Sequence, residues 1–518
     1  GGDQAAPQPA QEQASGQDSQ PTPSAPKILY AAGDGDWPKL DPHQATSGNE
    51  MPIVNLAYNG LVRWRPGTTE FEGDLAESWT SNEDSTVWTF KLRQGVQTQC
   101  GFGELTAADV KASFERTMDP NSGLPYVSDY ENVESITTEG DYQVTFHLKQ
   151  PDPLFLFSVQ NYHGGYVLPA EAIELGEELN MKSCGTGPFQ IVRNEPQNQV
   201  VLEAFDQYFR GRPKIDQIVY RYMPDINARL TALKNGELHV FLQGPDPTLK
   251  QQLESDPNVK LYFESPGTTF YVVYNTRFKP LDDVRVRQAL NYALDKEAIR
   301  DYFGVNAIPC SFVVEGYVGH AEDVMCYPYD PEKAKQLLAE AGYPNGFDLG
   351  VVTASTRDVH IDNYLLMQDM WSKIGVTFEI ERVDHSTWHA KIREGQQPFV
   401  EYGFVRPLYA HVPLYQFFHS DAIVGKETAI TNFSYYDGID ALLDEAAVTP
   451  DLDRRIELWQ EAQRKLAEEA LYSPLVQANR FLVTSSKLKL GYEDVLKDNM
   501  IPTQWYFPII TEQTELLD

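Results

Sequence analysis

The residues with the most specific chemical potential in this sequence are its four cysteines, Cys100, Cys184, Cys310 and Cys326. None belongs to a C-x-x-C motif, which argues against a zinc ribbon and against a redox-active dithiol. An even number of cysteines in an exported chain favours disulfides. Cys310 and Cys326 bracket an aperiodic loop that one disulfide could close, which leaves Cys100 to pair with Cys184. Two pairs of buried free thiols are the alternative.

The best metal-ligand pattern is HSTWH, in which His385 and His389 lie one helical turn apart. No third ligand follows at a suitable spacing, so two solvated histidines are favoured over a metal site. The glycine pattern CGTGPF at residues 184–189 lacks the lysine and the helix cap of a phosphate-binding loop. Nucleotide-binding, serine-hydrolase and zinc-protease motifs do not occur in the sequence. We therefore expect no catalytic residue, no metal and no cofactor.

The composition predicts a large folded body with a distinct N-terminal segment. The 518 residues are too many for one hydrophobic core, and the net charge of −33 argues against nucleic-acid binding. No run approaches the roughly 18 apolar residues of a membrane span. Residues 1–27 are rich in Gln, Ala, Pro and Ser, which predicts a disordered tether. Such a tether favours an exported protein that contacts the membrane only through an N-terminal anchor.

The elements that must position these residues alternate between strands and helices. Thr106 and Asp109 form a predicted capping box at the start of a helix. Residues 282–303 and 451–471 carry the apolar spacing of amphipathic helices, and residues 330–342 combine an N-cap, a proline and a glycine stop. Runs with β-strand character lie between these helices. The pattern predicts a mixed α/β or α+β protein of two or three domains.

Several sequence blocks resemble the family 5 extracellular solute-binding proteins, which are receptors of ABC importers for oligopeptides, dipeptides, nickel complexes and some oligosaccharides. The blocks occur in the family order and span nearly everything after the tether. They are LDPH at 40–43, FEGDLAESWTSNEDSTVWTFKLRQGV at 71–96, LTAADVKASFERTMDP at 105–120, GTGPF at 185–189, YNTRFKPLDDVRVRQALNYALDKEAI at 274–299, YPYDPEKAKQLLAEAGYPNGF at 327–347 and LYSPLVQANRF at 471–481.

The resemblance implies a bilobal, three-domain fold with a hinge-closing cleft. Domain I, in lobe 1, would combine residues 28–56, 186–267 and 482–518. Domain II would be an insertion at residues 57–185 that packs on lobe 1, and domain III, at residues 268–481, would form lobe 2. The chain would cross between the lobes near GTTFYVV and VQANRFL, which would then act as the hinge.

The resemblance also implies a function. The protein would be a monomeric extracytoplasmic receptor, periplasmic or lipid-anchored, and it would not be an enzyme. It would capture an extended oligomeric solute between its lobes and deliver that solute to the membrane subunits of an ABC importer. A secreted hydrolase of such a solute, or a ligand receptor for a membrane sensor, is the alternative.

The ligand class stays open between oligopeptide and oligosaccharide. Peptide-binding members carry an Asp that pairs with the peptide ammonium, and that position falls on Tyr409, with Arg406 nearby and no acid in residues 402–418. The aromatic residues of this stretch would suit sugar rings. The expected ligand-binding residues are Thr46, Gly48, Tyr126, Tyr402, Arg406, Tyr409 and Tyr415.

The resemblance also bears on the cysteines. The family usually has an acid and a glycine in the loop that holds Cys100, and a small apolar residue at the position of Cys184. Both departures introduce a cysteine, at positions that would close domain II onto its junction with domain I. This coincidence supports the Cys100–Cys184 disulfide.

Overall fold

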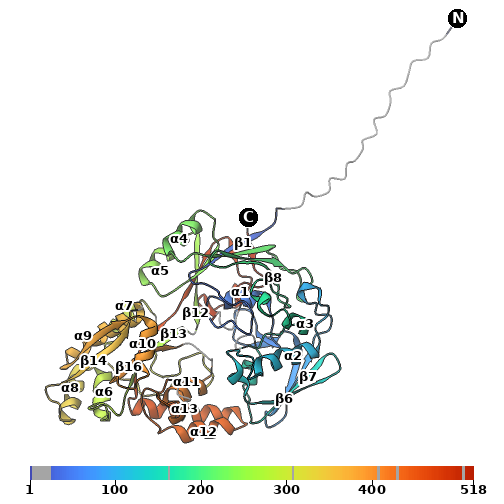
Figure 1. Cartoon of the computed structure of the whole chain (residues 1–518). Coiled ribbons are helices and arrows are strands. Elements are labelled where there is room, and N and C mark those ends of the chain that lie inside the picture. Colours follow the sequence, from blue (N-terminus) through green and yellow to red (C-terminus); the bar gives the residue numbers. More distant parts are fainter. Residues whose placement is uncertain are drawn as a thin grey trace.

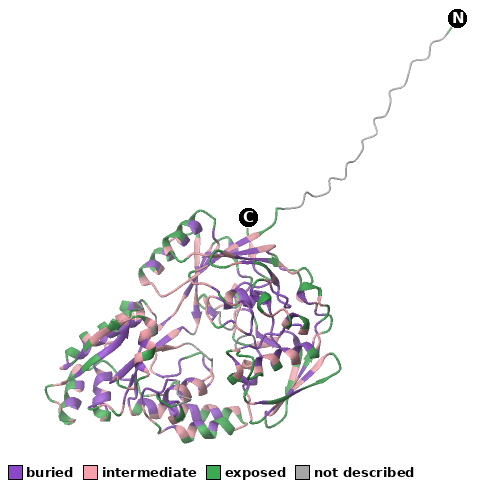
Figure 2. Ribbon diagram, viewed as in Figure 1, coloured by how far each residue is buried: buried purple, intermediate pink, exposed green. Residues whose placement is uncertain are grey.

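The protein folds into two lobes in the computed structural model (Figure 1). The structure describes residues 1–2, 25–160, 164–265, 267–305, 308–356, 358–404, 409–426, 431–503 and 508–517. Buried residues gather in the strands and on the inner faces of the helices, whereas the outer faces of the helices are exposed (Figure 2). This distribution follows from the amphipathic spacing of the helices and the alternating pattern of the strands.

Lobe 1 is built on an eight-stranded mixed sheet. Its strands come from segments far apart in the sequence, and β1 lies in the middle, where it pairs in parallel with β10 and β11. In spatial order the strands are β20 (Met500–Pro502), β12 (Val259–Ser265), β18 (Phe481–Ser485), β11 (Val240–Gln243), β1 (Ile28–Gly33), β10 (Gln217–Tyr222), β9 (Gln199–Ala204) and β8 (Phe189–Glu195). The helices are α1 (Met51–Ala57), α4 (Ile226–Lys234) and α5 (Pro247–Glu254), and β19 (Leu488–Lys489) pairs with β21 (Glu515–Leu516).

A second sheet of four antiparallel strands lies beside the first. Its order is β4 (Ala76–Ser81), β5 (Val87–Leu92), β7 (Gln143–Leu148) and β6 (Val133–Glu139), and α2 (Ala107–Met118) packs on β6 and β7. The predicted capping box of α2 is confirmed, because Thr106 N donates to Asp109 Oδ2 at 2.7 Å. The hairpin of β2 (Val62–Trp64) and β3 (Phe71–Gly73) and the short α3 (Ala170–Ile173) complete this region.

Lobe 2 holds a three-stranded sheet of β16 (Phe399–Phe404), β13 (Thr268–Tyr274) and β17 (Tyr472–Ala478). A parallel pair, β14 (Phe347–Ser355) and β15 (Val376–Val383), is joined by α9 (Asp358–Ser372). The remaining helices are α6 (Val284–Tyr292), α7 (Lys296–Phe303), α8 (Pro331–Glu340), α10 (His385–Ile392), α11 (His411–Phe418), α12 (Asp440–Val448) and α13 (Leu452–Glu468). The expected make-up of domains I, II and III is compatible with these sheets, and their boundaries stay a prediction.

One predicted helix is divided in two. The apolar spacing of residues 282–303 suggests a continuous helix, but α6 ends at Tyr292 and α7 begins at Lys296. Asp295 accepts a hydrogen bond from Ala298 N at 3.0 Å and so caps a new helix. An Asp side chain that bonds a backbone N–H two or three residues later competes with helix continuation, which explains the break.

The chain passes between the lobes twice, once from β12 to β13 and once from β17 to β18. The two crossings are tied to each other. Asn479 Nδ2 donates to Glu264 O at 2.6 Å, and Arg480 Nε donates to Glu264 Oε2 at 2.7 Å. The two connecting segments therefore lie side by side and join the lobes at one edge.

Both predicted disulfides are confirmed. Cys100 bonds Cys184 across 84 residues of sequence, and Cys310 bonds Cys326 across 16 residues. The first disulfide attaches the loop before α2 to the segment that leads into β8 of the large sheet. The second closes a loop whose Phe312 packs among aromatic rings of lobe 2, including Tyr271 and Phe404.

Candidate ligand-binding cleft

A cleft of about 830 Å³ lies between the lobes, and residues of both lobes line it. Lobe 1 contributes the end of β1 and the segment between β11 and α5. Lobe 2 contributes the start of β13, the first turn of α9, α10 and the end of β16. The lining residues are Asp34, Gln243, Gly244, Pro245, Asp246, Thr268, Phe270, Val359, His360, His385, Trp388, His389, Tyr402 and Gly403.

Aromatic packing holds the lobe 2 wall together. Trp388 of α10 is only 1% exposed and stacks on both His385 and Tyr402, with ring centroids 5.2 Å and 5.6 Å apart. Tyr402 also packs against Phe417 of α11 at 5.4 Å. Because α10 and β16 are fixed by these contacts, the cleft wall is a preformed surface.

A buried carboxylate lies behind this wall. Glu401, on β16, is completely buried, and its Oε2 lies 2.6 Å from His360 Nδ1 of α9. Its Oε1 accepts a hydrogen bond from Asn363 Nδ2 at 2.7 Å. His360 is 8% exposed and lines the cleft. Glu401 therefore orients a histidine of the cleft wall from behind, although the two residues belong to different elements.

His385 and His389 share one face of α10, as their spacing predicts, and both are half-buried and line the cleft. His389 Nε2 lies 3.2 Å from His385 Nε2, His385 Nδ1 lies 3.0 Å from Ser355 Oγ, and Arg393 donates to His389 Nδ1 at 3.0 Å. Since arginine can only donate, His389 Nδ1 accepts and its proton sits on Nε2. Within the described ranges, no three His, Cys, Asp or Glu side chains come together in a way that could hold a metal ion.

Of the expected lobe 1 ligand residues, Thr46 and Gly48 lie on the segment after LDPH, and Tyr126 contacts that segment. The Thr46 N–H is already used, because it donates to Glu50 Oε2 at 2.7 Å. Tyr126 is buried, and its hydroxyl donates to the backbone oxygen of Ala45. Gly48 is half-buried on the same segment. Their contact with a ligand stays a prediction.

The expected lobe 2 ligand residues separate in the structure. Tyr402 lines the cleft. Tyr409 packs against Phe157 with ring centroids 5.6 Å apart, and burial raises its pKa. Tyr415 stacks on His419 at 4.3 Å and its hydroxyl lies 3.5 Å from Asp421 Oδ2. Arg406 lies outside the described residues. The ligand roles of all four stay predictions.

Sequence reasoning missed most of the cleft. Asp34, Gln243 and Asp246 on lobe 1 and the His360–Glu401 pair on lobe 2 carried no recognisable motif. The spacing of His385 and His389 indicates only a possible metal pattern. Their common location depends on how α9, α10 and β16 pack, which local spacing does not encode.

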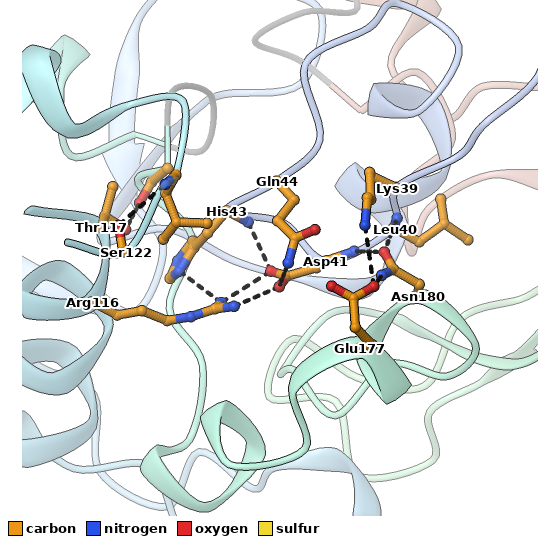
Figure 3. Close-up of polar contacts among 12 residues, drawn as sticks. Lys39, Leu40, Asp41, His43, Gln44, Arg116, Thr117, Ser122, Glu177 and Asn180 are labelled. Carbon is orange, nitrogen blue, oxygen red and sulfur yellow. Dashed lines mark hydrogen bonds and ion pairs between the residues drawn. The ribbon is translucent and has the colours of Figure 1, made fainter. Parts of the chain in front are cut away.

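The LDPH motif forms a separate buried cluster. Asp41 is completely buried and accepts two hydrogen bonds from Arg116 of α2, at 3.0 Å and 2.6 Å (Figure 3). Burial alone would raise the pKa of Asp41, but the Arg116 hydrogen bonds and the charges of His43 and Arg116 hold it below its usual value. Arg116 also donates to His43 Nδ1, so His43 Nε2–H donates to Tyr166 O at 2.9 Å. This cluster joins the segment after β1 to α2.

The two lobes are joined at one edge by two crossings, and both of them line the cleft that separates them. This arrangement defines a bilobal binding protein. Residues 70–424 match the sequence model of a protein family, the bacterial extracellular solute-binding proteins, family 5 Middle. The chain belongs to this family, and it is a solute-binding protein of the ABC-importer class. Among the residues that the structure describes, no helix has the length and apolar character needed to cross a membrane.

Individual relatives cover most of the chain. Heme-binding protein A of Haemophilus influenzae is 31% identical over 473 residues, which cover 84% of each chain. The dipeptide-binding protein of Escherichia coli is 30% identical over 86% of this chain and 88% of its own. Among solved structures, MoaA of A. tumefaciens R10 in complex with mannopinic acid is 33% identical, with a TM-score of 0.78 over 95% of this chain and 100% of that chain.

Proposed function

We propose that this protein captures a peptide or a related amino-acid-derived solute between its lobes and delivers it to an ABC importer. The observation that carries this proposal is the cleft of about 830 Å³ with walls from both lobes. A ligand that contacts both walls stabilises the closed arrangement, because it adds interactions that the open arrangement lacks. In this proposal the crossings near GTTFYVV and VQANRFL are the hinge, and the division into domains I, II and III follows the expected boundaries.

The choice of a peptide-like solute over an oligosaccharide rests on the aromatic residues of the cleft. Trp388 is 1% exposed and its ring is already stacked, so it offers no open face to a sugar. Tyr402 is the aromatic residue of the described 402–418 stretch that lines the cleft. The names of two relatives, a dipeptide-binding protein and a protein in complex with mannopinic acid, support the same class of solute.

The importer, the anchor and the oligomeric state complete the proposal. The protein acts as a monomer outside the cytoplasmic membrane, and residues 1–27 connect it to an anchor there. The receptor role predicts that ligand is recovered chemically intact after release, whereas a hydrolase would return products.

Native mass spectrometry of the purified protein, followed by denaturation and analysis of the released small molecule, tests this function. We expect a co-purified peptide or amino-acid conjugate, and the same compound should raise the melting temperature by mass action. The peptide-like class would be refuted if an oligosaccharide co-purified with the protein. It would also be refuted if oligosaccharides raised the melting temperature and no peptide or amino-acid conjugate did.

A further inference from the structure

The lobes also touch each other away from the two crossings. The segment 151–157, which follows β7 beside the four-stranded sheet, contacts lobe 2 in two places. Arg455 of α13 donates from Nη2 to Pro151 O at 2.5 Å. The ring of Tyr409 packs against the ring of Phe157, with centroids 5.6 Å apart. Lobe 2 therefore meets the region of the four-stranded sheet through one charged contact and one aromatic contact.

Arg455 is held in position by its own lobe. It is only 6% exposed, its Nε donates to Thr449 O at 2.6 Å, and its Nη2 also donates to Ala447 O at 3.1 Å. Burial lowers the pKa of Arg455, and the charge of Asp152, in the segment 151–157, opposes this shift. A buried cation that bonds neutral oxygens within its own lobe is stabilised by a carboxylate from the other lobe. Separation of the lobes would remove both Pro151 O and the charge of Asp152.

The segment 151–157 is likewise held by contacts that do not involve lobe 2. Asp152 accepts a hydrogen bond from Leu154 N at 2.9 Å through Oδ1, and its backbone N–H donates to Ser85 O at 3.0 Å. Phe157 packs edge-to-face on Phe71, with ring centroids 5.0 Å apart. These contacts persist whether or not the lobes are together, so the segment presents a fixed surface to lobe 2.

Two fixed surfaces favour association because little conformational freedom is lost when they meet. Closure adds a hydrogen bond from a charged donor, the attraction between Arg455 and Asp152, and the aromatic contact of Tyr409 with Phe157. None of these four residues lines the cleft of about 830 Å³. The interlobe contact therefore stabilises the closed arrangement through interactions that a solute in this cleft does not supply.

We propose that Arg455 and Tyr409 of lobe 2, with Asp152 and Phe157 of the segment 151–157, form a latch that closes the lobes before a solute binds. The latch gives the region of the four-stranded sheet a role in closure, although this region contributes no residue to the described lining of the cleft. The inference goes beyond the proposed function, in which closure is driven by the solute. A protein that is partly closed beforehand loses less of its binding free energy to closure, so its apparent affinity rises.

Single-molecule fluorescence energy transfer on the full chain tests the latch without any solute. Dyes are attached through azide-bearing residues introduced at two exposed positions, Glu134 of β6 and Ala339 of α8, so that both disulfides are left intact. Bound solute is removed first, and native mass spectrometry verifies its removal. The measurement counts closed and open molecules, and we expect the ligand-free wild-type protein to contain a closed population.

Variants on both sides assign the closed population to the latch. Arg455→Met should lower the ratio of closed to open molecules by about 10-fold or more, because a hydrogen bond from a charged donor is lost. Asp152→Asn keeps the acceptor for Leu154 N and removes only the charge, so the ratio should fall by about 3-fold. The double variant should match Arg455→Met, since Asp152 acts through Arg455. Arg454→Met is the matched control, because Arg454 is exposed and pairs within lobe 2, and it should retain the wild-type ratio.

The latch is refuted if the ligand-free wild-type protein shows no closed population, or if its ratio equals those of both variants. A fall in Arg455→Met without any fall in Asp152→Asn would place the effect of Arg455 within lobe 2 and would also refute the latch. Asp152→Asn leaves every contact of Arg455 inside lobe 2 intact, so the test holds even if Arg455→Met fails to fold. The identity of the co-purified solute does not enter this measurement, so the proposed function is judged separately.

Discussion

Each lobe buries one carboxylate beside a histidine, and the two sites differ in how the charge is balanced. Asp41 in lobe 1 and Glu401 in lobe 2 are both completely buried. Asp41 is paired with Arg116 through two hydrogen bonds, at 3.0 Å and 2.6 Å. Glu401 contacts His360 at 2.6 Å and Asn363 at 2.7 Å. Arginine is always protonated, whereas histidine is protonated only when its surroundings favour it.

The difference separates a structural site from one that a ligand can influence. The charge of Asp41 is neutralised inside the protein, between the segment after β1 and α2 (Figure 3). Glu401 is instead hydrogen-bonded to a residue that lines the cleft, His360. A ligand that contacts His360 would therefore act on a ring that Glu401 holds in place. Loss of the first site should therefore cost stability, and loss of the second should chiefly cost affinity.

The largest expected effect is that of Arg116→Leu. The substitution leaves the Asp41 charge buried without its partner, which should lower the free energy of unfolding by about 3–5 kcal/mol. Chemical denaturation followed by circular dichroism measures this change. A loss below about 1 kcal/mol would show that Asp41 does not depend on Arg116, and the contrast between the two lobes would fail.

The next effect is a pH dependence that originates in lobe 1. Burial, with a smaller contribution from the charge of Arg116, lowers the pKa of His43 to about 4, although the charge of Asp41 opposes this shift. The unfolded chain therefore binds a proton at a pH where the folded chain does not. The neutral His43 stabilises the fold fully above pH 6.5, and this contribution is lost as the pH falls from about 6.5 to 4. The loss should amount to about 3 kcal/mol.

The variant His43→Gln isolates this contribution. Its unfolding free energy should depend less steeply on pH between 6.5 and 4 than that of the wild-type protein, measured by denaturation at several pH values. His411, whose pKa burial also lowers to about 4, remains in both proteins and cancels in the comparison. Parallel pH profiles for the two proteins would contradict the assignment to His43.

The two sites also differ in how far the sequence predicts them. The helix caps at Thr106 and Asp330 and the two disulfides are predicted correctly, because local spacing and a small number of cysteines determine them. LDPH and the block at 105–120 that holds Arg116 are both recognisable, but the pairing of Asp41 with Arg116 is not. His360 and Glu401 are 41 residues apart, and only the packing of α9 on β16 brings them together. The lobe 2 cleft wall therefore could not be derived from periodicity or motif.

A smaller effect on stability is expected from Glu401→Gln. Glutamine retains the shape and one acceptor but removes the buried charge, so unfolding should become easier by only about 1 kcal/mol. The affinity for the co-purified solute should fall by about 10-fold, because the ring of His360 in the cleft wall loses the carboxylate that orients it. Calorimetry and denaturation on the same preparation measure both quantities. A variant that loses stability as Arg116→Leu does, with unchanged affinity, would make Glu401 a structural residue like Asp41.

The smallest effect is expected at Lys39, which lies beside the Asp41 cluster but pairs at the surface. Its Nζ lies 3.1 Å from Glu177 Oε2, and the two side chains are 40% and 75% exposed (Figure 3). Water screens such a pair and both side chains lose conformational freedom in forming it, so Lys39→Met should leave the denaturation midpoint unchanged within error. Lys39→Met thus serves as the control for Arg116→Leu, since both remove one cation from the same region. If the two variants lost similar stability, burial of the carboxylate would not be what distinguishes the Asp41 site.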